Sequence, residues 1–489
     1  MVNMKRTQAI LLSAALACTL LASCGEDTAK KSTDTNADTA PTTEATTETA
    51  AEDNVIRYQD DLGDLDFGGA EFRIRTIENL NVHSYVDVQE ETADVYDDAL
   101  YKRNRAVEER LNIVIKETLM PDDDAFRKTI TAGDDSCEMG NVRCDTAMNY
   151  WADELTYSIT DIPHINLEKP YWAKKLNDSI TLGENQYVAI GAYDVNVLDL
   201  TYALLFNKQL VSDFDFISPY TLVAEGKWTM DQMKFMMLQV VSDLNGDGTY
   251  TEDDRWGYLS HYKQVLPDFW IAAGEMSILK DQDDRPAINM TSDRFVSVFN
   301  KTFDIIWDTN VWYSKCDPSL DVPKDNVTIF SEGRALFMDV SFFHIENLRN
   351  AETEFGILPY PKYDEAQEEY YSRVSYYWAN VVPVTNTKNL DMTGAVIEAM
   401  NCESANTVVP AYYDVALKTK YSRDEESAAM LDLIFENRVV DLGDTLFCGD
   451  IRDGFMASMF QKNSRDLASQ VAKKEKLITK KIDKLPIWD

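Results

Sequence analysis

Apolar and polar positions follow two different periods along residues 54–489, and the switches between them predict strands and helices in turn. Glu71–Ile77 (EFRIRTI) alternates with period two, as a half-buried strand does. Thr92–Leu111 places apolar residues at helical spacing with charges between them, and Asn112–Glu117 returns to a strand pattern. The three segments form a βαβ unit, whose strands belong in a parallel sheet.

Further segments of both kinds follow. We expect helices at Phe126–Gly133, Trp228–Asp243, Ser292–Asp308 and Glu425–Val439, the second beginning with the capping-box spacing of Thr229 and Gln232. We expect the end of a strand at Cys144–Trp151, a long apolar strand from Asp199 that turns at Asn207 into a short helix, and strands at Gly333–Ser341 and Ala379–Thr385. No internal repeat is visible, and the pattern is α/β throughout.

The first residues have a different character. Lys5 and Arg6 precede an apolar run of about fifteen residues, which suits a secretory signal and is too short to span a bilayer well. The run leads into Leu-Ala-Ser-Cys, which ends at Cys24 and resembles the lipobox of bacterial lipoproteins. The resemblance implies a signal peptide over residues 1–23, cleavage before Cys24, and acylation of its thiol by chains such as palmitate. The alternative is an ordinary signal peptide that happens to contain a cysteine.

Residues 24–53 are rich in Thr, Ala, Glu and Asp and have no aromatic or large aliphatic side chain. Such a segment buries too little apolar surface to offset its ordering entropy, so we predict a disordered tether. The tether would hold a globular body outside the cell membrane, anchored by lipid.

The remaining 436 residues (489 − 53) are too many for one small core and favour two lobes. The net charge of −37 argues against nucleic-acid or anionic-lipid binding by the body. The cysteines show no CxxC pair, and the four histidines no HxxxH pair, so zinc-ribbon, thioredoxin and histidine-metal sites lack support. Cys137 and Cys144 are near enough in sequence to close a small loop, and the sequence leaves this open.

Ser242–Tyr258 (SDLNGDGTYTEDDRWGY) has the spacing of a twelve-residue calcium loop. Its oxygen ligands would be Asp243, Asn245, Asp247, the Thr249 carbonyl, Thr251 and Asp254, with Gly248 at the sharp turn. The last position is Asp in place of the usual Glu, and the side chain is one methylene shorter, which disfavours bidentate closure. The alternative is a solvated acidic turn.

The flanks of this loop restrict its role. A helix enters it, but the exit (RWGYLSH, Arg255–His261) is short, aromatic and strand-like. A calcium sensor needs a second helix, and a paired docking module needs a second copy of the loop. We therefore expect a bound Ca²⁺ to be structural.

Several blocks together resemble a known family: DDALYKRNRAVEERLNI, LLFNKQLV, GKWTMDQM leading into the calcium-type loop, GRALF followed by FGILPYPKYDEAQEEYYS, and VVPVT. In this order they are similar to the extracellular solute-binding proteins of bacterial ABC importers, sugar-binding family 1. The resemblance covers nearly the whole mature chain. It implies a periplasmic-binding-protein-like fold with two α/β lobes, several chain crossings and a ligand cleft that closes by hinge motion. We place lobe 1 at 54–202 plus about 380–428, and lobe 2 at 203–379 plus about 429–489.

The resemblance also implies ligand-contacting residues near strand ends that face the cleft. Sugars present CH faces to aromatic rings and hydroxyl groups to carboxylates and amides. The candidates are Asn149, Tyr150, Trp151, Asp194, Asp199, Tyr262, Trp270, Phe342, Phe343, Tyr377 and Trp378. Trp228, Trp256 and Trp307 are interpreted as packing residues.

The leading hypothesis is a non-enzymatic, monomeric binding protein that captures a carbohydrate, with an oligosaccharide as the first choice, and delivers it to the permease of an ABC transporter. An extracellular carbohydrate-active enzyme is the alternative, since paired carboxylates can do acid–base work. No G-x-S-x-G, HExxH or P-loop motif occurs. A surface adhesin or the ligand-binding subunit of a sensor is a third possibility, which the sequence does not separate from transport.

Overall fold

The computed structural model describes residues 57–77, 86, 88–183, 185–307, 311–313, 324–348, 351, 353–413 and 425–486. They belong to one unit, Ile56–Asp489. The predicted signal peptide, Cys24 and nearly all of the tether lie outside the described residues. Among the described helices, none combines the length and apolar character needed to cross a membrane.

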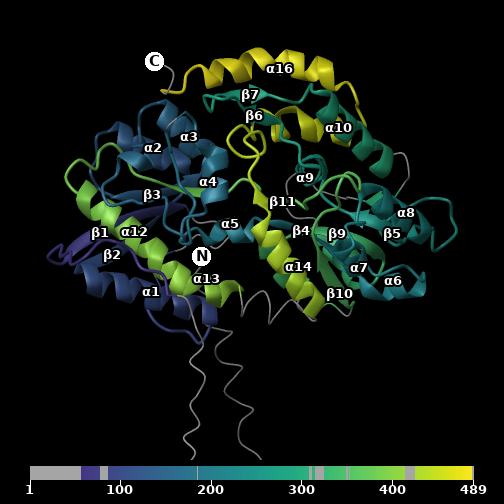
Figure 1. The fold of residues 1–489 in the computed structure, drawn as a ribbon, viewed down its shortest axis with the longest axis horizontal. Coiled ribbons are helices and arrows are strands. Elements are labelled where there is room, and N and C mark those ends of the chain that lie inside the picture. Colours follow the sequence, from purple (N-terminus) through teal and green to yellow (C-terminus); the bar gives the residue numbers. More distant parts are fainter. Residues whose placement is uncertain are drawn as a thin grey trace, which may run out of the picture. The chain divides into compact units, whose positions relative to one another are not determined.

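The first sheet has the strand order β12-β3-β1-β2 (Figure 1). The predicted βαβ unit is confirmed: α1 connects β1 and β2, which pair in parallel from Ala70↔Ile113 onward. β3 pairs in parallel with β1, and β12 is antiparallel to β3. The elements of this half are β1 (Ala70–Ile77), α1 (Val95–Leu111), β2 (Ile113–Met120), α2 (Asp123–Thr131), β3 (Met139–Arg143), α3 (Cys144–Ala152), α4 (Lys174–Ile180), β12 (Trp378–Val381), α12 (Leu390–Asn406) and α13 (Val408–Pro410).

Local chemistry sets the limits of α1. The Asp94 carboxylate accepts hydrogen bonds from the backbone N–H groups of Tyr96 and Asp97, so the helix begins at Val95 and not at Thr92. Asn112 ends it in the left-handed region at φ 50°, which asparagine tolerates better than most residues. Asp94 and Asn112 thus set the first and last residues of the helix.

The predicted strand end at Cys144–Trp151 is wrong. The strand is Met139–Arg143, and Cys144 begins helix α3. Ala147, Met148 and Trp151 are buried at positions i, i+1 and i+4, which is a helical spacing. A short apolar run does not distinguish the two structures by itself.

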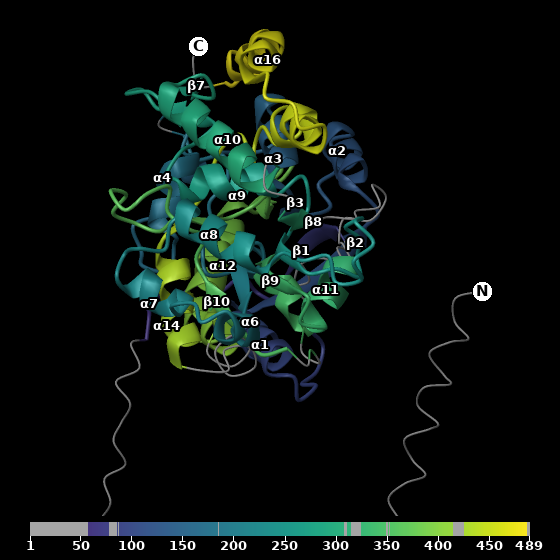
Figure 2. The same cartoon turned by 90° about the vertical axis from the view of Figure 1, so that its right-hand side faces the viewer.

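The second sheet has the order β10-β4-β9-β5-β8. β4 is buried at every position and is antiparallel to β9 and β10, while β5 is parallel to β9 and β8. The elements of this half are α5 (Val195–Asp199), β4 (Tyr202–Asn207), α6 (Lys208–Asp213), α7 (Pro219–Ala224), α8 (Met230–Val240), β5 (Trp256–Leu259), α9 (Val265–Ala272), β6 (Ile278–Lys280), β7 (Pro286–Ile288), α10 (Asp293–Ile306), β8 (Trp312–Tyr313), α11 (Lys324–Ser331), β9 (Ala335–Ser341), β10 (Phe355–Leu358), α14 (Glu425–Glu436), α15 (Ala457–Gln461) and α16 (Leu467–Ile482). The pair β6–β7 forms a separate two-stranded sheet that contacts α16, and both views draw them side by side (Figures 1 and 2).

Most predicted elements of this half are present with shifted ends. The Asp199 strand begins three residues later, at Tyr202, because Val195–Asp199 forms α5. The helix predicted from Trp228 begins at Met230, where the Thr229 hydroxyl accepts from the Gln232 N–H at 3.3 Å as the capping-box spacing predicts. The strand-like exit of the calcium-type loop is β5.

Three chain segments run side by side where the chain passes between the two sheets. Thr201 and Val374 form an isolated bridge, and the Ser375 N–H donates to the Leu200 carbonyl at 3.0 Å. β11 (Ser372–Arg373) pairs in parallel with β13 (Arg438–Val439), and Figure 1 draws β11 between the two halves. We call these segments the crossing. The exact lobe boundaries stay a prediction.

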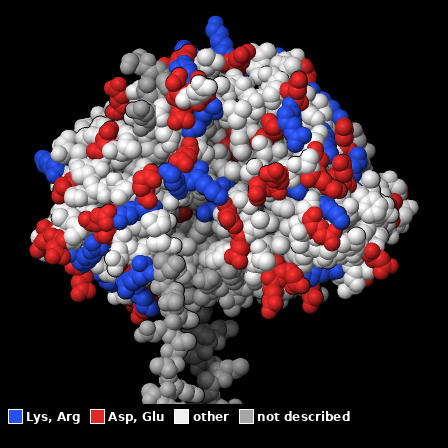
Figure 3. Space-filling view, in the orientation of Figure 1, with Lys and Arg blue, Asp and Glu red and all other residues white. Residues whose placement is uncertain are grey.

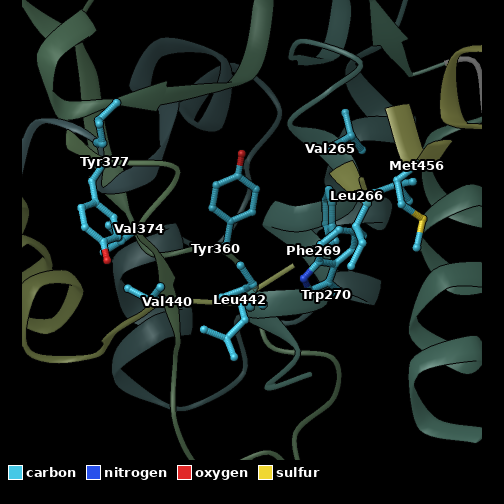
Figure 4. Close-up of a cluster of buried hydrophobic side chains, with 14 of the residues drawn as sticks. Val265, Leu266, Phe269, Trp270, Tyr360, Val374, Tyr377, Val440, Leu442 and Met456 are labelled. Carbon is cyan, nitrogen blue, oxygen red and sulfur yellow. The ribbon is translucent and has the colours of Figure 1, made fainter. Parts of the chain in front are cut away.

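The largest hydrophobic cluster contains residues from both sheets, including Val142 of β3 and Leu204 of β4. Figure 4 shows part of it, with Val374 of the crossing and Trp270 of α9 among the buried side chains. Cys137 and Cys144 are both buried free thiols, so the small disulfide loop that the sequence left open is not formed.

Candidate ligand-binding cleft

One wall of the candidate site lies at the edge of the second sheet. The parallel strands β5 and β9 end there, and the antiparallel β4 begins there with Tyr202. Ligands of open α/β sheets bind outside the carboxyl ends of the strands. A cavity of about 70 Å³ occupies this edge and is lined by Tyr202, His261, Gln264, Asn326, Val327, Met338, Asp339, Val340, Ser341 and His344.

Burial controls the charges in this wall. Burial raises the pKa of Asp339 well above its usual range, and the negative charge of Asp268 adds to the effect. Burial also lowers the pKa of His344, whose Nδ1 lies 2.7 Å from the Ser341 hydroxyl oxygen. The cavity therefore offers several hydrogen-bonding groups and little net charge. Such a surface suits a neutral polar ligand.

A buried ion cluster supports this wall from the crossing. Arg373 of β11 donates to Asp444 at 2.6 Å and to Asp268 at 2.9 Å, and all three side chains are essentially inaccessible to solvent. The same guanidinium donates to the Gln264 Oε1 atom at 2.7 Å and lies 4.6 Å from the centre of the Tyr202 ring. Arg373 thus holds two residues that line the cavity.

We interpret the charged and aromatic side chains that follow β3 as the opposite wall of the candidate cleft. Arg143 donates through Nε to Asp145 at 2.9 Å, and its guanidinium lies 5.5 Å from the centre of the Tyr376 ring. The guanidinium of Arg452 lies 4.7 Å from the same ring, and the Trp378 ring is 5.8 Å from it. An aromatic residue of the crossing is therefore surrounded by two cations and a second ring.

Asp453 connects the two walls electrostatically. Burial alone would raise its pKa, but Arg452, Lys263 and Arg143 together hold the pKa of Asp453 below its usual range. Lys263 follows β5 of the second sheet, whereas Arg143 ends β3 of the first sheet. The charges of both halves therefore act on one carboxylate, as expected of a cleft between lobes.

The first group of sequence-predicted residues lies on α3, which directly follows Arg143. Trp151 stacks on Tyr187 with ring centres 5.6 Å apart, and the Tyr150 hydroxyl donates to the Asp123 carbonyl at 2.5 Å. Asn149 is exposed on the same helix. The ligand contact predicted for these residues stays a prediction, but the two rings already have partners in the core.

Trp270 and Tyr377 are also enclosed. The Trp270 indole N–H donates to Asp441 at 2.9 Å, and Figure 4 shows both aromatic residues inside the buried cluster. Phe342 stacks on Phe435 with ring centres 4.9 Å apart. A ligand would reach these three rings only after side chains in contact with them had moved.

The two carboxylates predicted to contact the ligand, Asp194 and Asp199, accept hydrogen bonds from distant segments of the chain. Asp194 accepts from the Gly191 N–H at 2.8 Å and from the Asn380 side chain at 2.6 Å, and Asp199 accepts from the Tyr412 hydroxyl at 2.6 Å. Burial raises the pKa of Asp194 to about 7. Both are buried, so their ligand role also stays a prediction.

Three predicted residues do lie near the cleft walls. The Tyr262 ring is 4.4 Å from the His261 ring, the Phe343 ring is 5.3 Å from the His344 ring, and Trp378 lies beside Tyr376. Both histidines line the cavity.

Sequence reasoning missed Tyr202, His261, Gln264, Asp339, His344, Arg143, Tyr376 and Arg373. A signal was present for some of them, because Tyr202 begins a long apolar run and His261 follows the short strand after the calcium-type loop. Polar residues at the ends of buried strands are therefore candidates for ligand contact, as tryptophans are.

The calcium-type loop is closed at its base by two hydrogen bonds between Ser242 and Arg255, both 3.0 Å. The Asp243 carboxylate accepts from the N–H groups of Gly246 at 2.7 Å and Gly248 at 2.8 Å. Asp254 accepts from the N–H groups of Leu244 and Thr251, and these bonds lower its pKa.

The side chains of Asn245 and Asp247 likewise accept from the backbone two residues further on, at Asp247 and Thr249. The proposed ligands therefore already accept hydrogen bonds within the loop, and Asp254 Oδ2 accepts two, from the N–H and the hydroxyl of Thr251. Within the described part of the chain, no three His, Cys, Asp or Glu side chains gather closely enough to hold a metal. Calcium binding stays a prediction, and it requires the three aspartates to draw together.

The chain folds into two α/β halves joined by the crossing, and solved structures share this fold. The chain is similar to an ABC substrate-binding protein, Lmo0181, from Listeria monocytogenes in complex with cycloalternan (14% identity, 84% of this chain, 99% of that chain, TM-score 0.54). It is also similar to the sugar-binding protein MalE from Xanthomonas citri (12% identity, 85% of this chain, 98% of that chain, TM-score 0.57). UspC from M. tuberculosis is a third similar structure (12% identity, 83% of this chain, 98% of that chain, TM-score 0.55). The predicted two-lobed periplasmic-binding-protein fold is confirmed. No family model and no curated protein matches the sequence.

Proposed function

We propose that the protein is the carbohydrate-binding component of an ABC importer, and that it captures its ligand by closure of the two lobes. The observation that supports the proposal is the cavity at the ends of β5 and β9, where Tyr262 and Phe343 lie beside the two histidines of its lining. Charges from both halves act on Asp453. The Listeria protein was solved with cycloalternan, and a maltose/maltodextrin-binding MalE domain of the same fold was solved with maltotriose. We further propose that Cys24 is the acylated anchor and that the permease is the partner.

A carbohydrate screen tests this function. We expect one class of soluble oligosaccharide to raise the Tm, because a ligand at 100 times its Kd stabilises the folded state by about 2.7 kcal/mol. The bound sugar should be recovered intact. Release of a cleaved product would instead identify a carbohydrate-active enzyme, and no rise with any glycan would contradict the proposal.

Tyr262 provides the matched test of the site. We expect Tyr262→Ala to weaken binding of that oligosaccharide by about tenfold or more, because aromatic contacts with a ligand are each worth about 0.5–1.5 kcal/mol beyond the area they bury. Tyr250→Ala is the control, since Tyr250 is an exposed tyrosine of the calcium-type loop. Isothermal titration calorimetry measures both. Equal losses in the two variants would place the ligand elsewhere.

We also propose that the Asp243–Asp254 loop binds one structural Ca²⁺. With about 1 mM calcium and a Kd of about 10⁻⁴ M, the ion would stabilise the fold by about 1.4 kcal/mol. EDTA should therefore lower the Tm, and Asp247→Ala should abolish this response. Asp253→Ala is the control, because Asp253 is an exposed carboxylate of the same loop that is outside the ligand set. A Tm that is indifferent to EDTA would leave the loop as a hydrogen-bonded turn.

A further inference from the structure

A second and larger cavity, of about 440 Å³, lies beside the crossing. Its walls include Tyr171 and Trp172, which precede α4, Val197 and Leu198 of α5, Tyr413, and Arg438 of β13. We call it the rear pocket. Its volume falls within the range of small-molecule sites, about 300–1,000 Å³.

The rear pocket and the cleft cavity lie on opposite faces of the crossing. In the parallel pair β11–β13, Arg373 is opposite Val439, and Ser372 is opposite Arg438. Successive side chains of a strand point to opposite faces, so Arg438 points away from the side on which Arg373 holds Gln264 and Tyr202. The two cavities also share no lining residue.

Arg438 is the charged group of the rear pocket that has no acidic partner among the described residues. Its Nε donates to the Phe435 carbonyl at 3.1 Å, and no salt bridge to a described carboxylate is present. Burial lowers the pKa of Arg438 to about 10, so the guanidinium remains a cation at neutral pH. Its two terminal nitrogens have no hydrogen-bond acceptor among the described residues, and they form a fork of donors, the geometry that matches a carboxylate.

The other ionisable group of the rear pocket, apart from its tyrosines, does not neutralise this cation. The two carboxylate oxygens of Asp194 accept from Gly191 and Asn380, and burial raises its pKa to about 7. Asp194 is therefore partly protonated at neutral pH, and its hydrogen bonds connect it to the first lobe.

We propose that the rear pocket is a second binding site, for a small cyclic molecule that carries one carboxylate. The carboxylate pairs with the Arg438 fork, and the ring packs between the aromatic walls formed by Tyr171, Trp172 and Tyr413. Two sources share this chemistry, an acidic monosaccharide and an aromatic acid. The site is independent of the carbohydrate cleft.

Isothermal titration calorimetry of the full chain tests the proposal. Sodium glucuronate is compared with glucose, and sodium benzoate is compared with benzyl alcohol. We expect at least one carboxylate to bind about tenfold or more tightly than its counterpart, because hydrogen bonds between charged groups are stronger than those between neutral groups. Preference for glucuronate indicates an acidic sugar, and preference for benzoate an aromatic acid. If neither carboxylate binds better than its neutral counterpart, the proposal is wrong.

Variants locate the binding. Arg438→Gln should remove the preference for the carboxylate and Arg438→Lys should keep part of it, whereas Arg105→Gln, on an exposed arginine, should change nothing. Leu198→Phe narrows the pocket without touching the cation and should also weaken binding, which covers the case in which Arg438→Gln does not fold. Tyr262→Ala should leave carboxylate binding intact. A failure of the carbohydrate-cleft hypothesis can therefore be distinguished from a failure of the rear-pocket proposal. Unchanged binding in Arg438→Gln would overturn the assignment.

Discussion

Arg373→Met is expected to destabilise the folded protein by about 3–5 kcal/mol at pH 7, the usual cost of removing one partner from a buried ion pair. Asp268 and Asp444 are both fully buried and both accept hydrogen bonds from this guanidinium. Methionine has a similar length but no charge, so the variant leaves two carboxylates without their main cation. Urea unfolding monitored by fluorescence measures the loss.

The destabilisation should be smaller at pH 5 than at pH 7. Burial already raises the pKa of Asp268 to about 6 in spite of the opposing charge of Arg373. Without Arg373 this pKa rises further, and protonation at pH 5 removes the uncompensated charge. The folded pKa of this carboxyl lies above its unfolded value, so its ionisation costs stability as the pH rises.

A surface pair provides the control. Arg127 and Asp153 also form an ion pair, but their side chains are 39% and 53% exposed. Arg127→Met should cost less than about 1 kcal/mol, because exposed pairs contribute little. A comparable loss in the two variants would mean that the crossing does not depend on the buried cluster.

The order of secondary structure could be predicted because periodicity and capping are local. The β1-α1-β2 unit was visible in the alternation of Glu71–Ile77 and in the helical spacing that follows it. The start of α8 was visible in the Thr229 and Gln232 spacing. These signals lie within one or two turns of chain, so no tertiary contact was needed to interpret them.

The candidate site could be predicted only in part, because it depends on contacts between distant segments. Arg373 binds Asp268 and Asp444, which are 105 and 71 residues away in the sequence. A short sequence pattern does not predict contacts over such separations. Trp151 and Trp270 were predicted as ligand contacts from their residue type, but neighbouring side chains enclose them in the core. Residue type alone does not tell a ring that stacks on a ligand from a ring that fills a core.

The pH dependence of stability is expected to run opposite to ordinary acid denaturation between about pH 4 and pH 7. Burial raises the pKa of Asp194 to about 7 and that of Asp441 to about 6, from a usual value of 3.8. In this range the unfolded chain has already lost the proton that the folded protein keeps. The free energy of unfolding therefore falls as the pH rises, and Asp194 alone would account for about 4 kcal/mol at 1.36 kcal/mol per pKa unit.

Asp194→Asn tests this assignment. The amide is neutral at every pH and retains one acceptor oxygen, so the variant should lose the part of the decline that lies between pH 6 and pH 7. Asp441 and Asp268, whose pKa values are raised to about 6, should keep the part below pH 6. Asp231→Asn, at a carboxylate whose side chain is 70% exposed, should keep the wild-type slope. Asp254 affects the stability in a different pH range, because its pKa is lowered in the folded protein. The stability that it contributes is lost only as the pH falls below 3.8. Urea titrations at pH 5, 6 and 7 separate the two effects, and a wild-type stability that is flat or rising across that range would show that Asp194 is ionised at little cost.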